Sequence, residues 1–428
     1  MTVRLPQDRR LRWELAILAC MYAGYMGFIL CRSAIFAASP AMVADPALGL
    51  SKTMFGAILG WGTAGMVAGK LLNGAVADRL GGRRVFLLAL LITAASACAL
   101  GAASRFAAFA ALNFTMLFAA AAGWPAMAQL ISAWYPPQEY GRVWGVVSTS
   151  SRLSSVLSAL FLGALLARLA WPSLFWAAGA LTAAAAAVLC VFLKGRPADV
   201  GLAAPAASGA RPPDSAGLGA ALRGFAASGR FWLICVSIMC TTVLMEVIGF
   251  LPLYLKENFG VSASAAATAA AVFPAGCFAA LLLGGFVYDR VTRRGRVFLL
   301  GGMLLLSCAS LAALLALTRL PTGSPASFAA AVAILFVYGL SVAPAYYLPM
   351  SVFSVEFGGR HCGVLIGIID AVGYGAAMLY QFLGGAIVDQ PGGWDRMLVL
   401  LLAVAAAATA STAWFAYQDS AAQARAGR

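Results

Sequence analysis

The stretch GAVADRLGGRR, Gly74 to Arg84, decides the fold because a similar stretch recurs later in the chain. The second copy is GFVYDRVTRRGR, Gly285 to Arg296. Each copy follows the second of six apolar segments and places an Asp-Arg pair before a cluster of arginines. Repetition at matched positions predicts two related halves, each built from the same kind of unit.

Apolar segments surround both copies, and most run for about 20 residues, enough for a helix to cross the ~30 Å hydrocarbon core of a bilayer. The chain has 428 residues, of which 62% are hydrophobic and only 10% charged. Soluble domains contain about 25% charged residues, so this composition excludes an ordinary soluble protein. Backbone polar groups in lipid must bond within their own segment, which predicts an all-α membrane protein.

The apolar runs predict twelve transmembrane helices in two pseudo-symmetric sets of six. The predicted ranges are 14–38, 52–77, 85–103, 106–132, 143–167 and 170–193, then 231–255, 263–288, 297–318, 326–352, 363–387 and 393–417. The segment 194–230 is rich in Pro, Ala, Gly and Ser and predicts a flexible linker. The expected domains are an N-terminal bundle over 1–193, the linker over 194–230 and a C-terminal bundle over 231–428.

Basic residues fall in the short loops between the apolar runs and account for the net charge of +14. Twenty of them lie on the side that would hold both termini, and six lie on the other side. Cytoplasmic loops carry the excess of Lys and Arg, so both termini are expected in the cytoplasm. The charge therefore reports membrane topology, and no nucleic-acid partner is expected.

Five charged residues lie inside predicted helices rather than in loops. They are Arg32, Lys70 and Arg152 in the first half and Glu246 and Asp370 in the second. Charge inside a membrane is costly and generally faces a bundle interior or a watery cavity, so each is a candidate functional residue. Arginine offers a planar fork for phosphate, phosphonate or carboxylate, and lysine adds a point charge.

Structural roles for the three cations stay open at this point. Arg32 could pair with a neighbouring acid, and Lys70 could extend toward the cytoplasmic surface. Arg152 could form a permanent gate with Glu246 or Asp370 instead of binding substrate.

Two six-helix halves with G-x-x-x-D-R-x-G-R-R after the second helix resemble the major facilitator superfamily. The resemblance implies a substrate site near the bilayer midplane between the halves, exposed alternately to each side. It gives Asp78, Arg79, Asp289 and Arg290 a gating role at the inner side, although the motif could also serve only as a basic topology determinant.

Several segments are similar to the organophosphate:phosphate antiporter family. They are GYMGFILCRSAIFAASP (Gly24 to Pro40), KLLNGAVADR (Lys70 to Arg79), GWPAMAQLISAWYPPQEYG (Gly123 to Gly141), STSSRL and RPADVGL. The resemblance implies that Arg32 and Lys70 bind the substrate phosphate. The chain departs from the family pattern at Glu246, where a second arginine is expected, and at Gln129, Ser151 and Asp370.

The expected function is secondary transport of a small organic anion across a bacterial-type inner membrane: an organophosphate, a phosphonate or a related zwitterion. Proton-coupled symport of a carboxylate, with Glu246 or Asp370 as the proton carrier, is one alternative. A transporter-like sensor of sugar phosphate is another. Inorganic phosphate or a proton is the expected coupling species, and a monomer is expected. No enzyme activity, cofactor or metal is predicted. Further polar residues that could line the cavity are Tyr25, Ser151, Tyr346, Tyr347, Tyr374, Tyr380 and Gln381.

Overall fold

The computed structural model describes residues 6–203, 218–318, 324–358 and 362–426. All regular elements in these ranges are helices, which confirms the all-α prediction. Twelve helical spans are long and apolar enough to cross a membrane, the predicted number. The protein is therefore an integral membrane protein.

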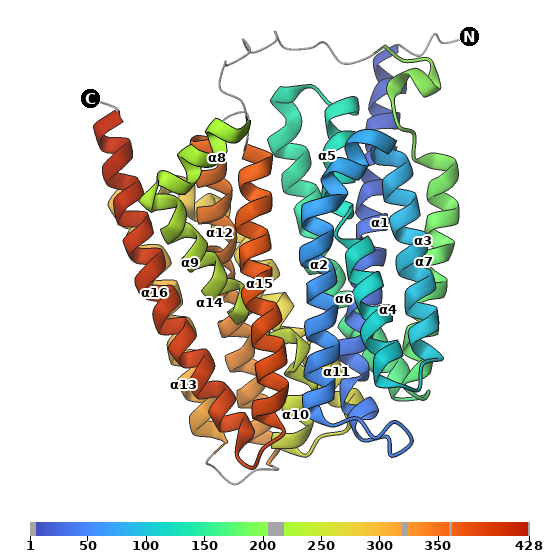
Figure 1. The fold of residues 1–428 in the computed structure, drawn as a ribbon, viewed down its shortest axis with the longest axis vertical. Helices are drawn as coiled ribbons and strands as arrows, with labels where there is room; N and C mark the ends of the chain where they lie inside the picture. Colours follow the sequence, from blue (N-terminus) through green and yellow to red (C-terminus); the bar gives the residue numbers. More distant parts are fainter. Residues whose placement is uncertain (1–5, 204–217, 319–323, 359–361, 427–428) are drawn as a thin grey trace.

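The spans form two sets of six along the chain (Figure 1). The first set is built from α1 (Pro6–Val43), α2 (Lys52–Leu80), α3 (Gly82–Gly101), α4 (Phe106–Ala120), α5 (Gly123–Trp134), α6 (Tyr140–Leu166) and α7 (Pro172–Phe192). The second is built from α9 (Gly229–Met245), α10 (Leu251–Phe259), α11 (Ala263–Ala269), α12 (Val272–Arg290), α13 (Arg293–Leu317), α14 (Pro325–Gly358), α15 (Cys362–Val388) and α16 (Gly393–Ala426).

Three helices predicted to be continuous are each broken near a proline. The range 106–132 divides into α4 and α5 just before Pro125, and 263–288 divides into α11 and α12 just before Pro274. The range 231–255 changes at Glu246 to a 3-10 turn, η3 (Glu246–Gly249), before α10 begins with Pro252 in its first turn. Proline cannot donate a backbone hydrogen bond and is tolerated in the first turn of a helix, so each break starts a new helix around the proline.

The predicted linker is more structured than its composition suggested. It contains a 3-10 turn, η2 (Pro197–Val200), and an amphipathic helix, α8 (Leu218–Ala227). The Asp199 side chain caps the turn by accepting hydrogen bonds from the backbone nitrogens of Gly195 and Arg196. Residues 204–217 lie outside the described part of the chain, so flexibility there, like the division into domains, stays a prediction.

The first set of spans lies on one side of the molecule and the second set on the other (Figure 1). The start of α1 and the end of α16 lie at the same end, which we call the terminal end. The loop before α2, with α10 and α11, lies at the opposite end, which we call the distal end.

Glycine lets the two sets approach closely near the distal end. A Cβ added to Gly56 on α2 would lie 2.5 Å from the Cα of Gly385 on α15, and one added to Gly385 would lie 2.7 Å from the Cα of Gly56. On α6, a Cβ at Gly163 would lie 2.3 Å from the hydroxyl of Thr268. Small residues at such crossings allow membrane helices to pack backbone to backbone.

Candidate functional site

Four of the five mid-span charges form ion pairs that cross from one set of spans to the other. Arg32 on α1 donates from Nη2 to both carboxylate oxygens of Glu246, each at 2.6 Å. The side chains are 16% and 7% exposed, respectively. Charge-assisted bonds of this length are strong, and burial keeps water from competing for them. Arg32 also lies over the ring of Phe36, with its guanidinium carbon 5.5 Å from the ring centre.

Glu246 has a second donor on its own side of the interface. Gln381 on α15 donates from Nε2 to Glu246 at 3.2 Å and accepts a hydrogen bond of 2.6 Å from the Thr63 hydroxyl on α2. This chain of contacts therefore crosses between the two sets twice. Glu246 begins the 3-10 turn that breaks the spanning helix, a local irregularity often found at functional hinges.

Lys70 on α2 forms the second cross-set pair, with Oδ2 of Asp370 on α15. The two side chains are 14% and 15% exposed. The Lys70 ammonium also lies 4.7 Å from the centre of the Tyr374 ring. Lys70 therefore does not extend to the terminal surface, although its long side chain would allow it.

Arg152 on α6 is a mid-span cation without an ion-pair partner among the described residues. Its guanidinium lies over the Tyr347 ring on α14, 5.2 Å from the ring centre, which is again a contact between the two sets. Glu246 and Asp370, the partners considered for a gate, are already paired with Arg32 and Lys70. The gate considered between Arg152 and one of these carboxylates is therefore not formed in this structure.

Besides the hydroxyl of Tyr380, three polar atoms of the mid-span charges are buried without a hydrogen-bond partner. Two are donors, Nε of Arg32 and Nε of Arg152, and one is an acceptor, Oδ1 of Asp370. An unsatisfied buried polar atom carries a desolvation cost of about 1–3 kcal/mol, more when the group is charged. The region thus has spare donors suited to an anion and one spare acceptor suited to a donor.

The remaining polar candidates lie beside these charges or apart from them. Tyr346 is buried and packs edge-on against Tyr347, with ring centres 4.8 Å apart. Ser151 is half-buried on α6 beside Arg152. Tyr25 is buried against Trp124, with ring centres 5.2 Å apart. Tyr25 therefore belongs at least partly to the aromatic core of the first set.

The first copy of the repeated motif lies at the terminal end of α2, about two helical turns beyond Lys70. Asp78 and Arg79 are exposed, and Asp78 accepts a 2.7 Å hydrogen bond from Gln129 on α5. Gln129 is the position where the related family carries a basic residue. Arg290 is exposed, whereas the side chain of Asp289 lies outside the described residues. The gating role of the motif stays a prediction.

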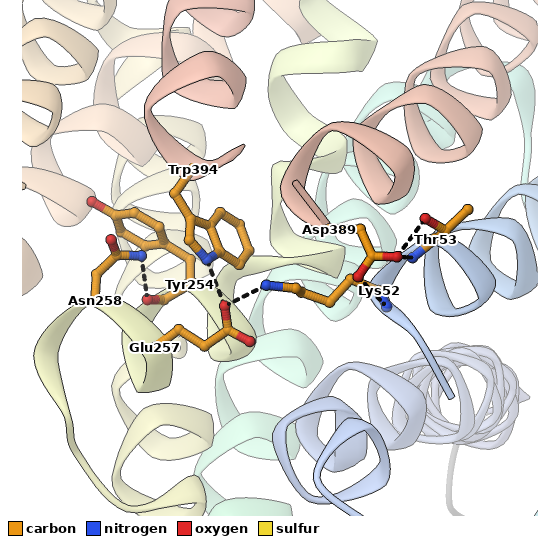
Figure 2. A network of polar contacts seen from close by, with 7 residues as sticks. All are labelled: Lys52, Thr53, Tyr254, Glu257, Asn258, Asp389 and Trp394. Atoms are coloured by element: carbon orange, nitrogen blue, oxygen red, sulfur yellow. Dashed lines mark hydrogen bonds and ion pairs between the residues drawn. The ribbon is translucent and has the colours of Figure 1, made fainter. Parts of the chain in front are cut away.

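A second polar network joins the two sets at the distal end (Figure 2). Asp389, just after α15, accepts hydrogen bonds from the backbone nitrogens of Lys52 and Thr53, both at 3.3 Å, and from the Thr53 hydroxyl at 2.7 Å. It therefore places a carboxylate at the N-terminus of α2, where the helix dipole favours negative charge. Lys52 pairs with Glu257 at 3.0 Å, and Trp394 donates to the same carboxylate at 2.7 Å. We call these five residues the distal network.

The sequence did not single out Thr63 or the distal network. Thr63 lies in the glycine-rich stretch GWGTAG, and the sequence there does not indicate whether its hydroxyl bonds to another helix or the side chain only packs in the core. Lys52, Glu257 and Asp389 lie at segment ends, where charge is ordinary in a membrane protein. The packing of α2 against α15 brings Thr63 to Gln381 and Lys52 and Thr53 to Asp389, while α10 and α16 contribute Glu257 and Trp394.

Comparison with known proteins agrees with the repeat and the helix count. The family model described as Major Facilitator Superfamily matches residues 21–379. A membrane sensor protein, UhpC of Salmonella typhimurium, is 28% identical over 300 residues, covering 68% of this chain and 67% of the relative. A probable hexose phosphate transport protein of Chlamydia pneumoniae is 27% identical over 44% of this chain and 41% of its own.

A solved structure has the same fold. A bacterial homolog of the human lysosomal transporter Spinster, crystallised in an inward-facing and unoccupied conformation, superposes with a TM-score of 0.75 at 19% identity. The match covers 95% of this chain and 97% of the other. The relatives named here are transport or sensor proteins rather than enzymes.

Proposed function

The chain belongs to the major facilitator superfamily, and from that premise we propose that it is a secondary active transporter of a small organic anion. Members of such folds expose a midplane site between two helical sets alternately to each side of the membrane. Arg32, Lys70 and Arg152 support the proposal, because each contacts the second set of spans, from α1, α2 and α6 respectively.

The unsatisfied arginine donors carry the proposal. Among the described residues Arg152 has no carboxylate partner, and Nε of both Arg32 and Arg152 is buried without an acceptor. Protein interiors rarely leave charged donors unpaired, because the cost is high. An anionic ligand between these side chains would satisfy them. Arg32 can keep Glu246 on Nη2 while its other nitrogens bind the ligand.

Phosphate and phosphonate esters are the anions that we propose first. Their tetrahedral oxygens fit two arginine forks and a lysine point charge together. The name of the Chlamydia relative and the motifs around Arg32 and Lys70 support this class. The carboxylates Glu246 and Asp370 beside the cations also suit a zwitterion such as an aminophosphonate.

We further propose that the terminal end faces the cytoplasm of a bacterial-type inner membrane. The excess of arginine in the loops at that end supports this orientation. In that orientation the distal network closes the external side. The close crossing of α2 and α15 at Gly56 and Gly385 would be the part that separates when the transporter opens outward.

Ligand-induced thermal stabilisation tests the proposal. A ligand at 100 times its Kd stabilises the folded state by about 2.7 kcal/mol. We expect glucose 6-phosphate or an aminophosphonate to raise the melting temperature of the wild-type protein, and R152Q to weaken that effect. R168Q, at an exposed arginine in the loop between α6 and α7, is the matched control and should respond as wild type does. Stabilisation that is unchanged in R152Q would contradict the assignment.

Two other functions have their own support. Glu246 and Asp370, each buried beside a cation, suit proton-coupled symport of a carboxylate substrate. In that case a proton gradient would drive substrate uptake. The similarity to UhpC suits a sensor, which would bind a sugar phosphate without moving it. Counterflow in proteoliposomes separates them: exchange of labelled hexose phosphate favours the transporter, and binding without exchange favours the sensor.

A further inference from the structure

The two cross-set ion pairs differ in how completely each carboxylate is satisfied. Both oxygens of Glu246 accept bonds from Arg32, and Gln381 adds another. Asp370 has Lys70 on Oδ2 only, and its buried Oδ1 has no donor. Glu246 is also the more enclosed, with its side chain 7% exposed against 15% for Asp370. The Lys70–Asp370 pair therefore has the carboxylate with fewer hydrogen bonds, and that carboxylate is also the more exposed of the two.

The pairs lie at different depths between the two ends. Lys70 is in the last part of α2 and Asp370 in the first part of α15, which places their pair toward the terminal end. Glu246 and Gln381 lie nearer the distal end, close to Phe250 and the glycine crossing. A solute that enters from the terminal end therefore meets Lys70 and Asp370 before it meets Arg32 and Glu246.

An anion that binds Lys70 competes with Asp370 for its positive charge, and Asp370 has no other donor among the described residues. An ionised carboxylate left unpaired in a buried site is strongly unfavourable. Glu246 does not face this problem, because an anion can bind the free edge of Arg32 while Nη2 and Gln381 stay on the carboxylate. The cost of binding an anion therefore falls on Asp370 alone.

We propose that Asp370 takes up the coupling proton. When the anion binds Lys70, a proton binds Oδ1 of Asp370 in the same event. Glu246 stays ionised and holds the two sets together through Arg32. One anion and one proton then enter the site together, and both leave when the site opens to the other side. This inference rests on the proposed function and adds the coupling ion to it.

The charged and titratable neighbours of Asp370 fit this role. Lys70 faces it from α2, Tyr346 from α14 and Tyr374 from the next turn of α15. On α9 and α16, Arg230 pairs with Asp419 at 3.1 Å, and Asp395 accepts from Thr318, so neither carboxylate competes for Lys70. In the described part of the chain, Lys70 is thus the one cation that forms an ion pair with Asp370.

Proton uptake on binding tests the proposal. Glucose 6-phosphate is titrated into the purified protein at pH 8, where a phosphate monoester with a second pKa near 6 is almost fully ionised. Calorimetry in two buffers of different ionisation enthalpy then counts the protons bound. We expect about one proton per bound ligand for wild type and none for D370N.

Each outcome bears on one of the two proposals. Binding to wild type without proton uptake overturns the role of Asp370 but leaves the anion transporter in place. Uptake that survives in D370N and disappears in E246Q assigns the proton to Glu246 instead. Tighter binding of an aminophosphonate without proton uptake means that an ammonium group, not a proton, satisfies Asp370.

A second measurement needs no ligand, so failure to bind any probe contradicts only the proposed function. Infrared difference spectra during acidification report which carboxylate is protonated first. We expect the first carboxylic acid signal to be missing in D370N and present in E246Q. The reverse assignment would overturn the inference even if the substrate stays unidentified. Thermal melting of D370N shows whether that variant is folded.

Discussion

At the scale of single residues, the Arg32–Glu246 contact predicts a large and asymmetric effect of mutation. Removal of one member of a buried ion pair costs about 3–5 kcal/mol, because the other charge stays buried alone. R32M should therefore lower the melting temperature of the purified protein strongly. The double variant R32M/E246M should recover much of the loss, since it leaves no unpaired charge.

R105M, at an arginine in the loop between α3 and α4, serves as control and should melt as wild type does. Equal melting temperatures for R32M and wild type would mean that Glu246 has another strong partner. A double variant no better than R32M would mean that the pair is needed for folding itself.

Asp389 predicts how pH acts on the distal network. Burial opposes its ionisation, but the bonds from Thr53 and Lys52 outweigh burial and lower the pKa of Asp389 below its ordinary value. A group with a lowered pKa stabilises the folded state above that ordinary value and loses the effect as pH falls through the lowered one. D389N should therefore reduce stability equally at pH 5 and pH 8, and the difference should shrink below about pH 4.

Thermal melting of wild type and D389N over this pH range is the measurement. A difference that grows toward acid pH would contradict the assignment. D199N is a comparison at a carboxylate that also caps a helical turn, but within the linker. The D199N variant should leave the hydrogen bonds of the distal network unchanged.

At the scale of elements, the crossing of α2 and α15 depends on two glycines. G385A puts a methyl group 2.7 Å from both the Cα of Gly56 and the carbonyl oxygen of Lys52, so the helices must separate. Overpacking of this kind costs about 1–3 kcal/mol. G385A should lower the melting temperature and weaken closure at the distal end. G367A, on the same helix where an added Cβ meets nothing within 4 Å, is the matched control.

The sequence predicted some features of the helices and missed others. Hydrophobic runs and basic loops predicted the number and order of the spans, because lipid imposes length and composition on each helix separately. They did not predict the breaks at Pro125, Pro252 and Pro274, since a proline inside an apolar run can either kink or restart a helix. The sequence pointed to Arg32, Lys70, Glu246 and Asp370, but their pairing depends on which helices face each other.

At the scale of the whole molecule, alternating access requires the distal network to break in each transport cycle. The Thr53 hydroxyl and the Asp389 carboxylate are 2.7 Å apart across the two sets, so this pair of positions is suited to a cysteine cross-linking test. T53C/D389C should lose transport under oxidising conditions and regain it with reductant. Each single cysteine variant is the control, and counterflow in proteoliposomes is the measurement. Full transport by the cross-linked protein would contradict opening at this end.

The imbalance among the mid-span charges has an electrical consequence. The three cations and two carboxylates at mid-span leave one net positive charge among them when the site is empty. A dianionic ester with one proton on Asp370 would cancel that charge. The loaded carrier would then cross without electrical work, whereas the empty carrier would move one charge, worth about 2.3 kcal/mol per 100 mV. Membrane voltage should therefore set the rate of the return step and leave the loaded step nearly unaffected.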